Sequence, residues 1–353
     1  MPLTDIDGQR LGDSVGDKLG NRNLIINGAM VHDQRNSGSS VTPTNAQYLV
    51  DRFKVGATQS SKFTAQQSTT APTGFKNSLL LTSSSAFSLG ASDEFEIIQF
   101  IEGNNVAHCG FGTSNAQTLT LSFYARSSLT GTFGGAIYNG AANRSYPFTY
   151  TISTADTFEL QTVTFAGDTS GTWATDNTAG INVLFSLGAG SSKLGTPGAW
   201  TGSFKPGATG QTNLVATNGA TLYLSGVQLE VGNTATPFEH RSYGDELARC
   251  LRYYELLSNC TGRTVNTTDV DVAFFFRVEK RATPSTPSSL RPSPGSIAQF
   301  GRAAFTVTGL NTVFSISKTQ LGSNLTTADT GMTGGLFAAS ISGTPILEAD
   351  AEL

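Results

Sequence analysis

Two tryptophans and a cluster of tyrosine, asparagine and arginine side chains are the residues whose types could bind a ligand. An aromatic face can pack against the C–H face of a sugar ring, while amide and charged groups hydrogen-bond to its hydroxyls. The candidate glycan-binding residues are Trp173, Trp200, Tyr138, Tyr146, Asn143 and Arg144. We expect them in outer loops, because Gly and Thr surround the two tryptophans. The alternative is that each tryptophan is a plug packed on the core.

Residues suited to catalysis are scarce. The three histidines lie in no hydrolase motif. Asp93, Glu94 and Glu96 could pair as the carboxylates of a glycosidase, but adjacent acids at the start of a strand usually face water. Asp168 and Asp176 are too few oxygen ligands to specify calcium. We therefore expect no enzymatic activity, no cofactor and no metal.

Composition limits the classes of partner. The net charge is −4 with no basic run, so we expect no nucleic-acid binding. No apolar run approaches the roughly 20 residues of a membrane span, and no secretion signal is recognisable. Cys109, Cys250 and Cys260 have neither disulfide nor zinc spacing, so we expect buried free thiols. We expect the chain to fold in a reducing cytoplasm.

The first 22 residues differ from the rest. Glycine recurs at every fourth position from 8 to 20, which is too costly for a lone helix at about 1 kcal/mol per glycine. Apolar residues precede three of these glycines: Leu11, Val15 and Leu19. We interpret residues 1–22 as a peptide that docks on another protein, with a floppy tail as the alternative.

Residues 23–243 are expected to form a β-sandwich. In Leu119–Arg126, apolar and polar residues alternate with the period of a half-buried strand. Ser225-Gly226 predicts a bulge in a late strand. The other predicted strands are Tyr48–Val55, Ser78–Thr82, Phe95–Glu102, Tyr146–Ile152, Phe158–Phe165, Ile181–Leu187 and Thr221–Val231. Many short strands with Gly- and Asn-rich turns indicate an antiparallel sandwich or jelly roll.

The remaining chain is expected to contain one helix and a smaller β domain. Leu247, Leu251 and Tyr254 fall on one helical face, with acidic residues near the helix start, so we predict a connecting helix over 244–258. Residues 259–353 contain a Pro-rich stretch flanked by strand patterns, which indicates a C-terminal β domain.

Several motifs, taken in order, resemble the carbohydrate-binding-like domain of phage tail fibres and tail-associated proteins. The opening is Asn21–Met30, followed by Gln34-Arg35 and by Leu49–Phe53. The middle motifs are Gln99–Gly103 and Asp168–Trp173. The closing motifs are Gly226–Gly232, Ala235–Glu239 and Arg249–Tyr254. The resemblance covers residues 21–255 well and the remainder weakly, and only about twenty residues precede the opening motif.

This resemblance implies an all-β, jelly-roll-like sandwich, a homotrimer and a place in the virion, which lysis would release from the host cell. It leaves the location open among a short fibre, a baseplate-attached tip and a head-attached fibre. We expect host-surface recognition, with glycan as the target and without catalysis. The first rival is a purely architectural protein that binds other virion proteins. The second is a glycan-degrading tailspike, which usually needs a long repeated β-helix that the sequence does not show.

Overall fold

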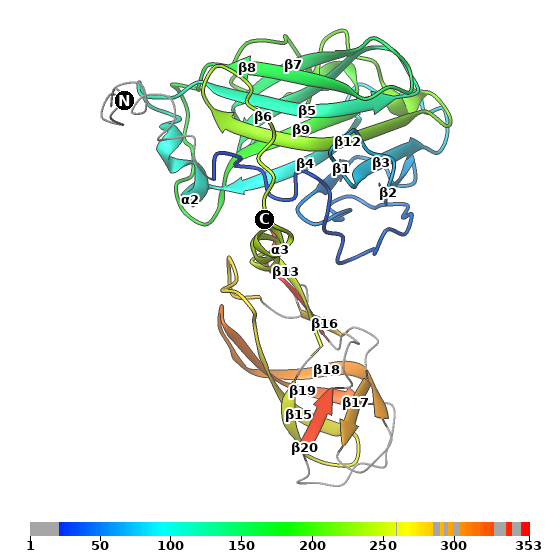
Figure 1. Ribbon diagram of the computed structural model, residues 1–353, viewed down its shortest axis with the longest axis vertical. Coiled ribbons are helices and arrows are strands. Elements are labelled where there is room, and N and C mark those ends of the chain that lie inside the picture. The colour runs from blue at the N-terminus through cyan, green and yellow to red at the C-terminus, as the bar shows by residue number, and fades with distance from the viewer. Residues whose placement is uncertain are drawn as a thin grey trace, which may run out of the picture. The chain divides into compact units, whose positions relative to one another are not determined.

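The computed structural model describes residues 21–258, 260–284, 290–292, 296–299, 304–327, 337–340 and 347–353 (Figure 1). These residues form two compact units that divide between Arg241 and Ser242. The expected docking residues Leu11, Val15 and Leu19 lie outside the described part of the chain. No described helix is long and apolar enough to cross a lipid bilayer.

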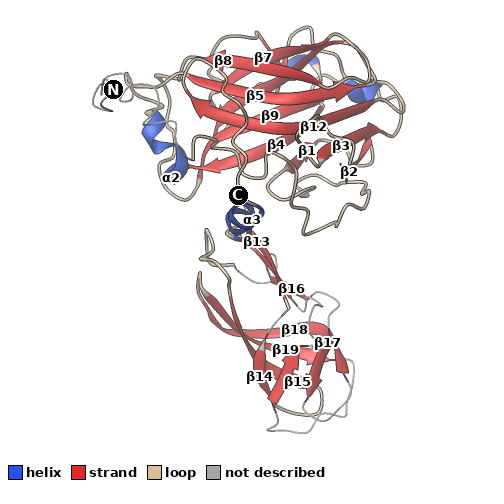
Figure 2. Ribbon diagram, viewed as in Figure 1, coloured by secondary structure: helices blue, strands red, loops and turns tan. Residues whose placement is uncertain are grey.

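The first unit is a sandwich of two five-stranded antiparallel sheets. Sheet I has the order β1 (Lys54–Ala57), β4 (Glu94–Glu102), β9 (Ala179–Ala189), β6 (Gly131–Asn139) and β7 (Ser145–Ile152). Sheet II has the order β2 (Phe63–Ser68), β3 (Ser78–Ser83), β12 (Thr221–Val231), β5 (Leu119–Ser127) and β8 (Glu159–Phe165). The expected jelly-roll-like β-sandwich is confirmed, and Figure 2 shows how strands dominate it.

Short elements connect these strands. The first is α2 (Gly103–Val106), and a parallel pair is formed by β10 (Leu194–Gly195) and β11 (Gly207–Ala208). Single turns of 3-10 helix span Ala107–Cys109, Ser191–Lys193 and Leu214–Ala216.

The core lies between the two sheets and follows the alternation of the sequence. In β5, Leu119, Leu121, Phe123 and Ala125 are all fully buried. Their neighbours Ser122, Tyr124 and Arg126 therefore lie on the opposite, outer face of sheet II. The predicted bulge is also confirmed, because the register of β12 against β5 shifts between Ser225 and Gln228.

One expectation within the sandwich was wrong, and one strand was not predicted. Most of Tyr48–Val55 is a buried turn, in which the Phe53 N–H donates to the Val50 carbonyl and Arg52 has a φ of 73°. In contrast, β6 is a strand that the sequence did not predict, because its glycines interrupt the pattern of apolar and polar residues. A Cβ on Gly135 would lie 2.3 Å from the Leu184 carbonyl oxygen, so this strand needs glycine to fit beside β9.

The second unit begins with a helix that is shorter than expected. α3 spans Tyr243–Leu251, where the Ser242 hydroxyl accepts from the Asp245 N–H and caps its first turn. Tyr254–Leu257 is strand β13 and not the continuation of this helix, which corrects the prediction of a helix over 244–258. Two residues of turn separate the helix from the strand.

Two small sheets make up the rest of this unit. β13 pairs with β21 (Leu347–Asp350), which also pairs with β16 (Leu290–Pro292) at the other edge. Six further strands form one closed antiparallel sheet. Its order is β14 (Thr261–Thr264), β15 (Asp269–Phe275), β19 (Gln320–Thr327), β18 (Ala304–Ile316), β17 (Ser296–Gln299) and β20 (Phe337–Ser340). All three cysteines are buried, as expected.

Candidate functional site

The structure brings three of the predicted aromatic residues together. Trp200 lies with its ring centroid 5.5 Å from that of Trp173 and 5.3 Å from that of Tyr146. Both indole N–H groups are already used within the loops: Trp173 donates to the Ser170 carbonyl and Trp200 to the Ala166 carbonyl. Only 9% of Trp173 is exposed. These rings therefore pack mainly on one another and on the core.

Arg144 and Asn143 lie beside this cluster but have protein partners. Arg144 makes a bidentate ion pair with the buried Asp168, at 2.6 Å from Nε and 2.7 Å from Nη2. This hydrogen-bonded carboxylate raises the pKa of Arg144. The exposed Asn143 closes the turn between β6 and β7, where it accepts from the Asn139 amide at 2.7 Å. Arg144 thus stabilises the loop that leads to Trp173, and Asn143 stabilises the turn between β6 and β7.

Tyr138 does not belong to the cluster. It lies on strand β6, not in a loop, and on the outer face of sheet I. There it packs edge-on against Phe204, 5.0 Å between centroids, and is only 5% exposed. Burial raises its pKa, with a smaller contribution from Glu96 and Glu94. The six predicted residues therefore do not form one surface, and their glycan-binding role stays a prediction.

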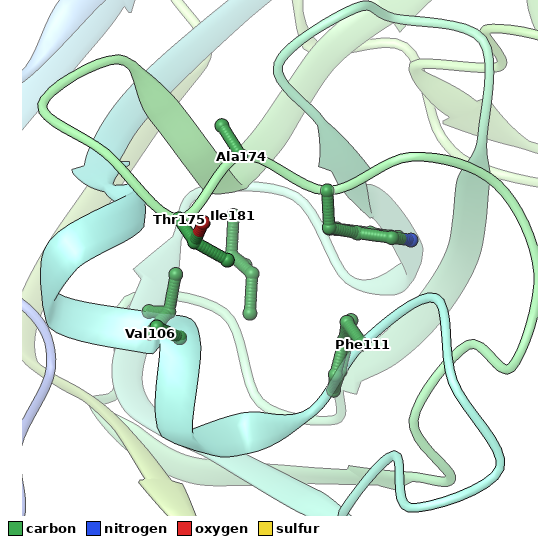
Figure 3. Close-up of a pocket in the computed structure, with 7 residues that line it drawn as sticks. Val106, Phe111, Ala174, Thr175 and Ile181 are labelled. Carbon is green, nitrogen blue, oxygen red and sulfur yellow. The ribbon is translucent and has the colours of Figure 1, made fainter.

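A small cavity lies under the Trp173 loop (Figure 3). In the figure, the side chains of Val106, Thr175 and Ile181 converge on it. Its volume is about 10 Å³, close to that of a single water site. It is lined by Val106, Ala107, Phe111, Trp173, Ala174, Thr175 and Ile181. A sugar ring does not fit there.

A much larger groove opens on the outer face of sheet II. Its volume is about 440 Å³, within the roughly 300–1,000 Å³ that is usual for small-molecule sites. The strands supply its floor, which consists of Ser122 and Tyr124 of β5, Leu160 of β8 and Gly226 of β12. We call this feature the outer groove.

Aromatic residues from two loops flank Tyr124 in the outer groove. Phe75, in the loop between β2 and β3, lies 5.5 Å from Tyr124 and 5.0 Å from Phe238. His240 lies 5.2 Å from Phe75 and 4.9 Å from Phe238. The four rings form one continuous cluster of mostly edge-to-face contacts, a geometry that stabilises aromatic pairs.

The β12 bulge makes room for this cluster. Gly226 has a φ of 60°, a left-handed conformation that glycine adopts at little cost. A Cβ at this position would lie 2.8 Å from Cζ of Phe75 and 3.1 Å from Cδ2 of Tyr124. The glycine of the bulge therefore lets the two rings meet across the strand.

The segment after β12 forms a wall of the outer groove, and buried polar groups hold this segment in place. Glu230 accepts from both the N–H and the hydroxyl of Thr236, at 2.8 and 2.6 Å. The Glu239 N–H donates to the Gln228 side chain at 2.8 Å. Arg22 donates to the Pro237 carbonyl at 2.6 Å. The wall residues are Ala235, Thr236, Pro237, Phe238 and His240.

Polar groups in the outer groove remain available to a ligand. Within the described part of the chain, the hydroxyls of Thr73, Ser122 and Tyr124 make no hydrogen bond. Each hydroxyl can both donate and accept. Aromatic faces and free hydroxyls are what a sugar ring requires. The described residues that line the groove include no carboxylate.

The sequence indicated parts of the outer groove without revealing it. Tyr124 lies on the polar side of the β5 alternation, and Ala235–Glu239 is one of the closing motifs. Phe75 carried no signal, because an isolated phenylalanine usually belongs to a core, and the motif that contains Phe238 did not mark its ring as part of a groove. Five chain segments meet in the groove, and only the pairing of the strands brings them together.

Comparisons with known proteins support a likeness of architecture alone. No family model and no curated protein matches this chain. Among solved structures, the enzymatically active domain of tailspike protein 4 of bacteriophage CBA120 is 11% identical, with a TM-score of 0.30. This match covers 60% of the present chain and 22% of that chain, so the chain spans about a fifth of the tailspike.

Two carbohydrate-binding modules are similar at the same level. TmCBM61, in complex with β-1,4-galactotriose, is 8% identical with a TM-score of 0.29, over 54% of this chain and 100% of its own. The family 11 module from Clostridium thermocellum, in complex with a mixed-linked tetrasaccharide, is 9% identical with a TM-score of 0.29, over 56% and 98%. At these values the likeness extends to β-rich architecture and carries no information on the ligand.

Proposed function

We propose that this chain is a non-catalytic, fibre-type virion protein of a bacteriophage, and that its outer groove binds a glycan of the host surface. The observation that carries the binding part is the outer groove, with its four aromatic rings and three free hydroxyls. The virion part rests on the ordered motifs of residues 21–255 that resemble phage tail-fibre domains. Attachment through residues 1–22 to another virion protein belongs to the same proposal.

Weak binding at each groove is compatible with adsorption to a cell. An aromatic contact contributes about 1 kcal/mol, so a single groove would bind a short glycan weakly. In a homotrimer, displayed many times on one particle, linked sites raise the overall avidity by about 10²- to 10⁴-fold. The proposal therefore includes trimeric display as the source of useful affinity.

The test compares two aromatic substitutions in assembled particles. Tyr124→Ala removes the ring on the groove floor, and Phe275→Ala removes an exposed ring, 71% accessible, that lies on β15 of the second unit. Both are outside the cores, so both variants should assemble. We expect Tyr124→Ala to slow adsorption to host cells by about tenfold or more, because the loss multiplies over linked sites. Phe275→Ala should leave adsorption unchanged.

Adsorption of both variants at the parental rate, in particles with normal fibre content, would refute glycan binding by the outer groove. The purely architectural role would then be the better account. A fall in the size of host polysaccharide incubated with the purified chain would instead favour the tailspike.

A further inference from the structure

The chemistry of the outer groove points to one class of ligand. We infer that it takes an uncharged saccharide that bears a methyl-containing substituent, such as an acetamido or a 6-deoxy group. This inference rests on the proposed function and adds the ligand class to it. Charge, apolar surface and hydrogen-bonding groups each support it separately.

The lining has no carboxylate, ammonium or guanidinium group to pair with a charged sugar. None of its residues is Asp, Glu, Lys or Arg, and its one nitrogen-containing side chain is that of His240. The two acids of the adjoining wall face the protein. Glu230, 2% exposed, accepts from Thr236, and Glu239 accepts from the N–H of Asn23. A charged substituent would lose hydration in the groove without gaining a counter-charge.

The floor and one wall of the outer groove expose apolar surface. A sugar whose substituents are all hydroxyl groups would cover this surface poorly. Leu160 is 57% exposed although it lies on a strand at the edge of the groove. Ala235 and Pro237 of the wall add aliphatic surface. Burying one ligand methyl group on such surface tightens binding by about three- to fivefold. A sugar with only hydroxyl substituents cannot make this gain.

The free hydroxyls match the polar part of such a substituent. An acetamido group has one N–H donor and one carbonyl acceptor, and the hydroxyls of Ser122 and Tyr124 lie on the same strand two residues apart. Because a hydroxyl can both donate and accept, this pair can satisfy both amide groups. A 6-deoxy sugar would hydrogen-bond its own hydroxyls to the same protein hydroxyls and place its methyl group on Leu160.

The experiment measures dissociation constants of matched sugars for the full chain by saturation-transfer NMR. Triacetylchitotriose, cellotriose and the deacetylated chitosan trisaccharide share one backbone and differ only in the 2-substituent. Methyl α-L-rhamnoside and methyl α-L-mannoside differ only in the 6-hydroxyl. We expect at least one methyl-bearing member to bind about threefold or more tightly than its hydroxyl counterpart. The charged trisaccharide should bind least.

Altered chains test which residues produce the preference for a methyl-bearing sugar. Leu160→Thr, which introduces a strand-compatible residue like Thr162 two positions further along β8, should abolish the preference for the methyl group and leave weak binding of cellotriose. Tyr124→Ala should weaken the binding of every sugar by about fivefold or more. A chain that begins at Asn21 should bind like the full chain, which excludes competition by residues 1–20.

Two results would overturn the inference. One is equal or tighter binding of the charged trisaccharide, and the other is equal binding within both matched pairs. If such sugars still lose binding in Tyr124→Ala, the proposed glycan function stands and only the ligand class is wrong. If no sugar binds and Tyr124→Ala particles adsorb normally, the proposed function fails as well.

Discussion

The carboxyl group of Glu96 is buried on the outer face of sheet I, 3% exposed, where it lies across from Gly56 of β1. A Cβ on Gly56 would lie 2.4 Å from Oε1 of Glu96, so the glycine leaves room for the carboxyl group. The sequence placed Glu96 in an acidic cluster facing water, and this expectation was wrong for Glu96. Burial, with a further contribution from Glu94, raises its pKa well above the ordinary value.

This raised pKa predicts a pH-dependent stability. A group whose pKa is higher in the folded state stabilises the fold below its unfolded pKa, about 4.3, and loses that contribution as the pH rises through the folded value. We expect Glu96→Gln to melt at a higher temperature than the parent at neutral pH, because glutamine cannot ionise. The difference in melting temperature between Glu96→Gln and the parent should shrink towards pH 4, as measured by thermal unfolding.

Asp93→Asn is the matched control, because Asp93 lies on the surface and its pKa is lowered, chiefly by a hydrogen bond from the Gly90 N–H. This substitution should give no gain at neutral pH. A gap between Glu96→Gln and the parent that does not change with pH would contradict the account of Glu96.

At the scale of elements, the sequence predicted those strands in which one face is apolar and the other polar. β5 follows its alternation residue by residue, and the Ser225-Gly226 bulge lies where it was expected. β6 was missed because its glycines fit close contacts with β9, which no local pattern reveals. The outer groove was missed for a related reason: its rings come from segments that only the assembled sheet brings together.

The bulge of β12 gives a prediction about this assembly. We expect Gly226→Ala to destabilise the sandwich by about 1–3 kcal/mol, because an alanine in the left-handed region costs about 1–2 kcal/mol and its methyl group collides with Phe75. Glycan binding should weaken too, since Phe75 must move. Chemical denaturation and sugar titration measure the two effects.

Gly210→Ala separates the backbone effect from the collision. Gly210 has a φ of 88°, but nothing lies within 4 Å of a Cβ added there. Gly210→Ala should therefore lose stability only because alanine is strained in the left-handed backbone conformation, and it should keep full glycan binding. If Gly226→Ala and Gly210→Ala behaved alike in both measurements, the packing of Phe75 over the bulge would have no functional role.

At the scale of the whole molecule, the proposal requires several grooves to act together. We expect the purified chain to be a homotrimer, so light scattering should give about three times the 37.0 kDa of one chain. The low charged fraction of 14% leaves much Ser, Thr and Ala surface suited to contacts between chains. A stable monomer at micromolar concentration would contradict trimeric display and remove the source of avidity.

The central claim is that the outer groove, and not the tryptophan cluster, holds the glycan. The most direct measurement is a crystal structure of the chain with oligosaccharides released from the host surface. The account predicts density for a sugar ring against Tyr124 and Phe238, with a sugar oxygen or amide within hydrogen-bonding distance of the Ser122 or Tyr124 hydroxyl. A sugar bound at Trp200 and Tyr146 with an empty outer groove would contradict it.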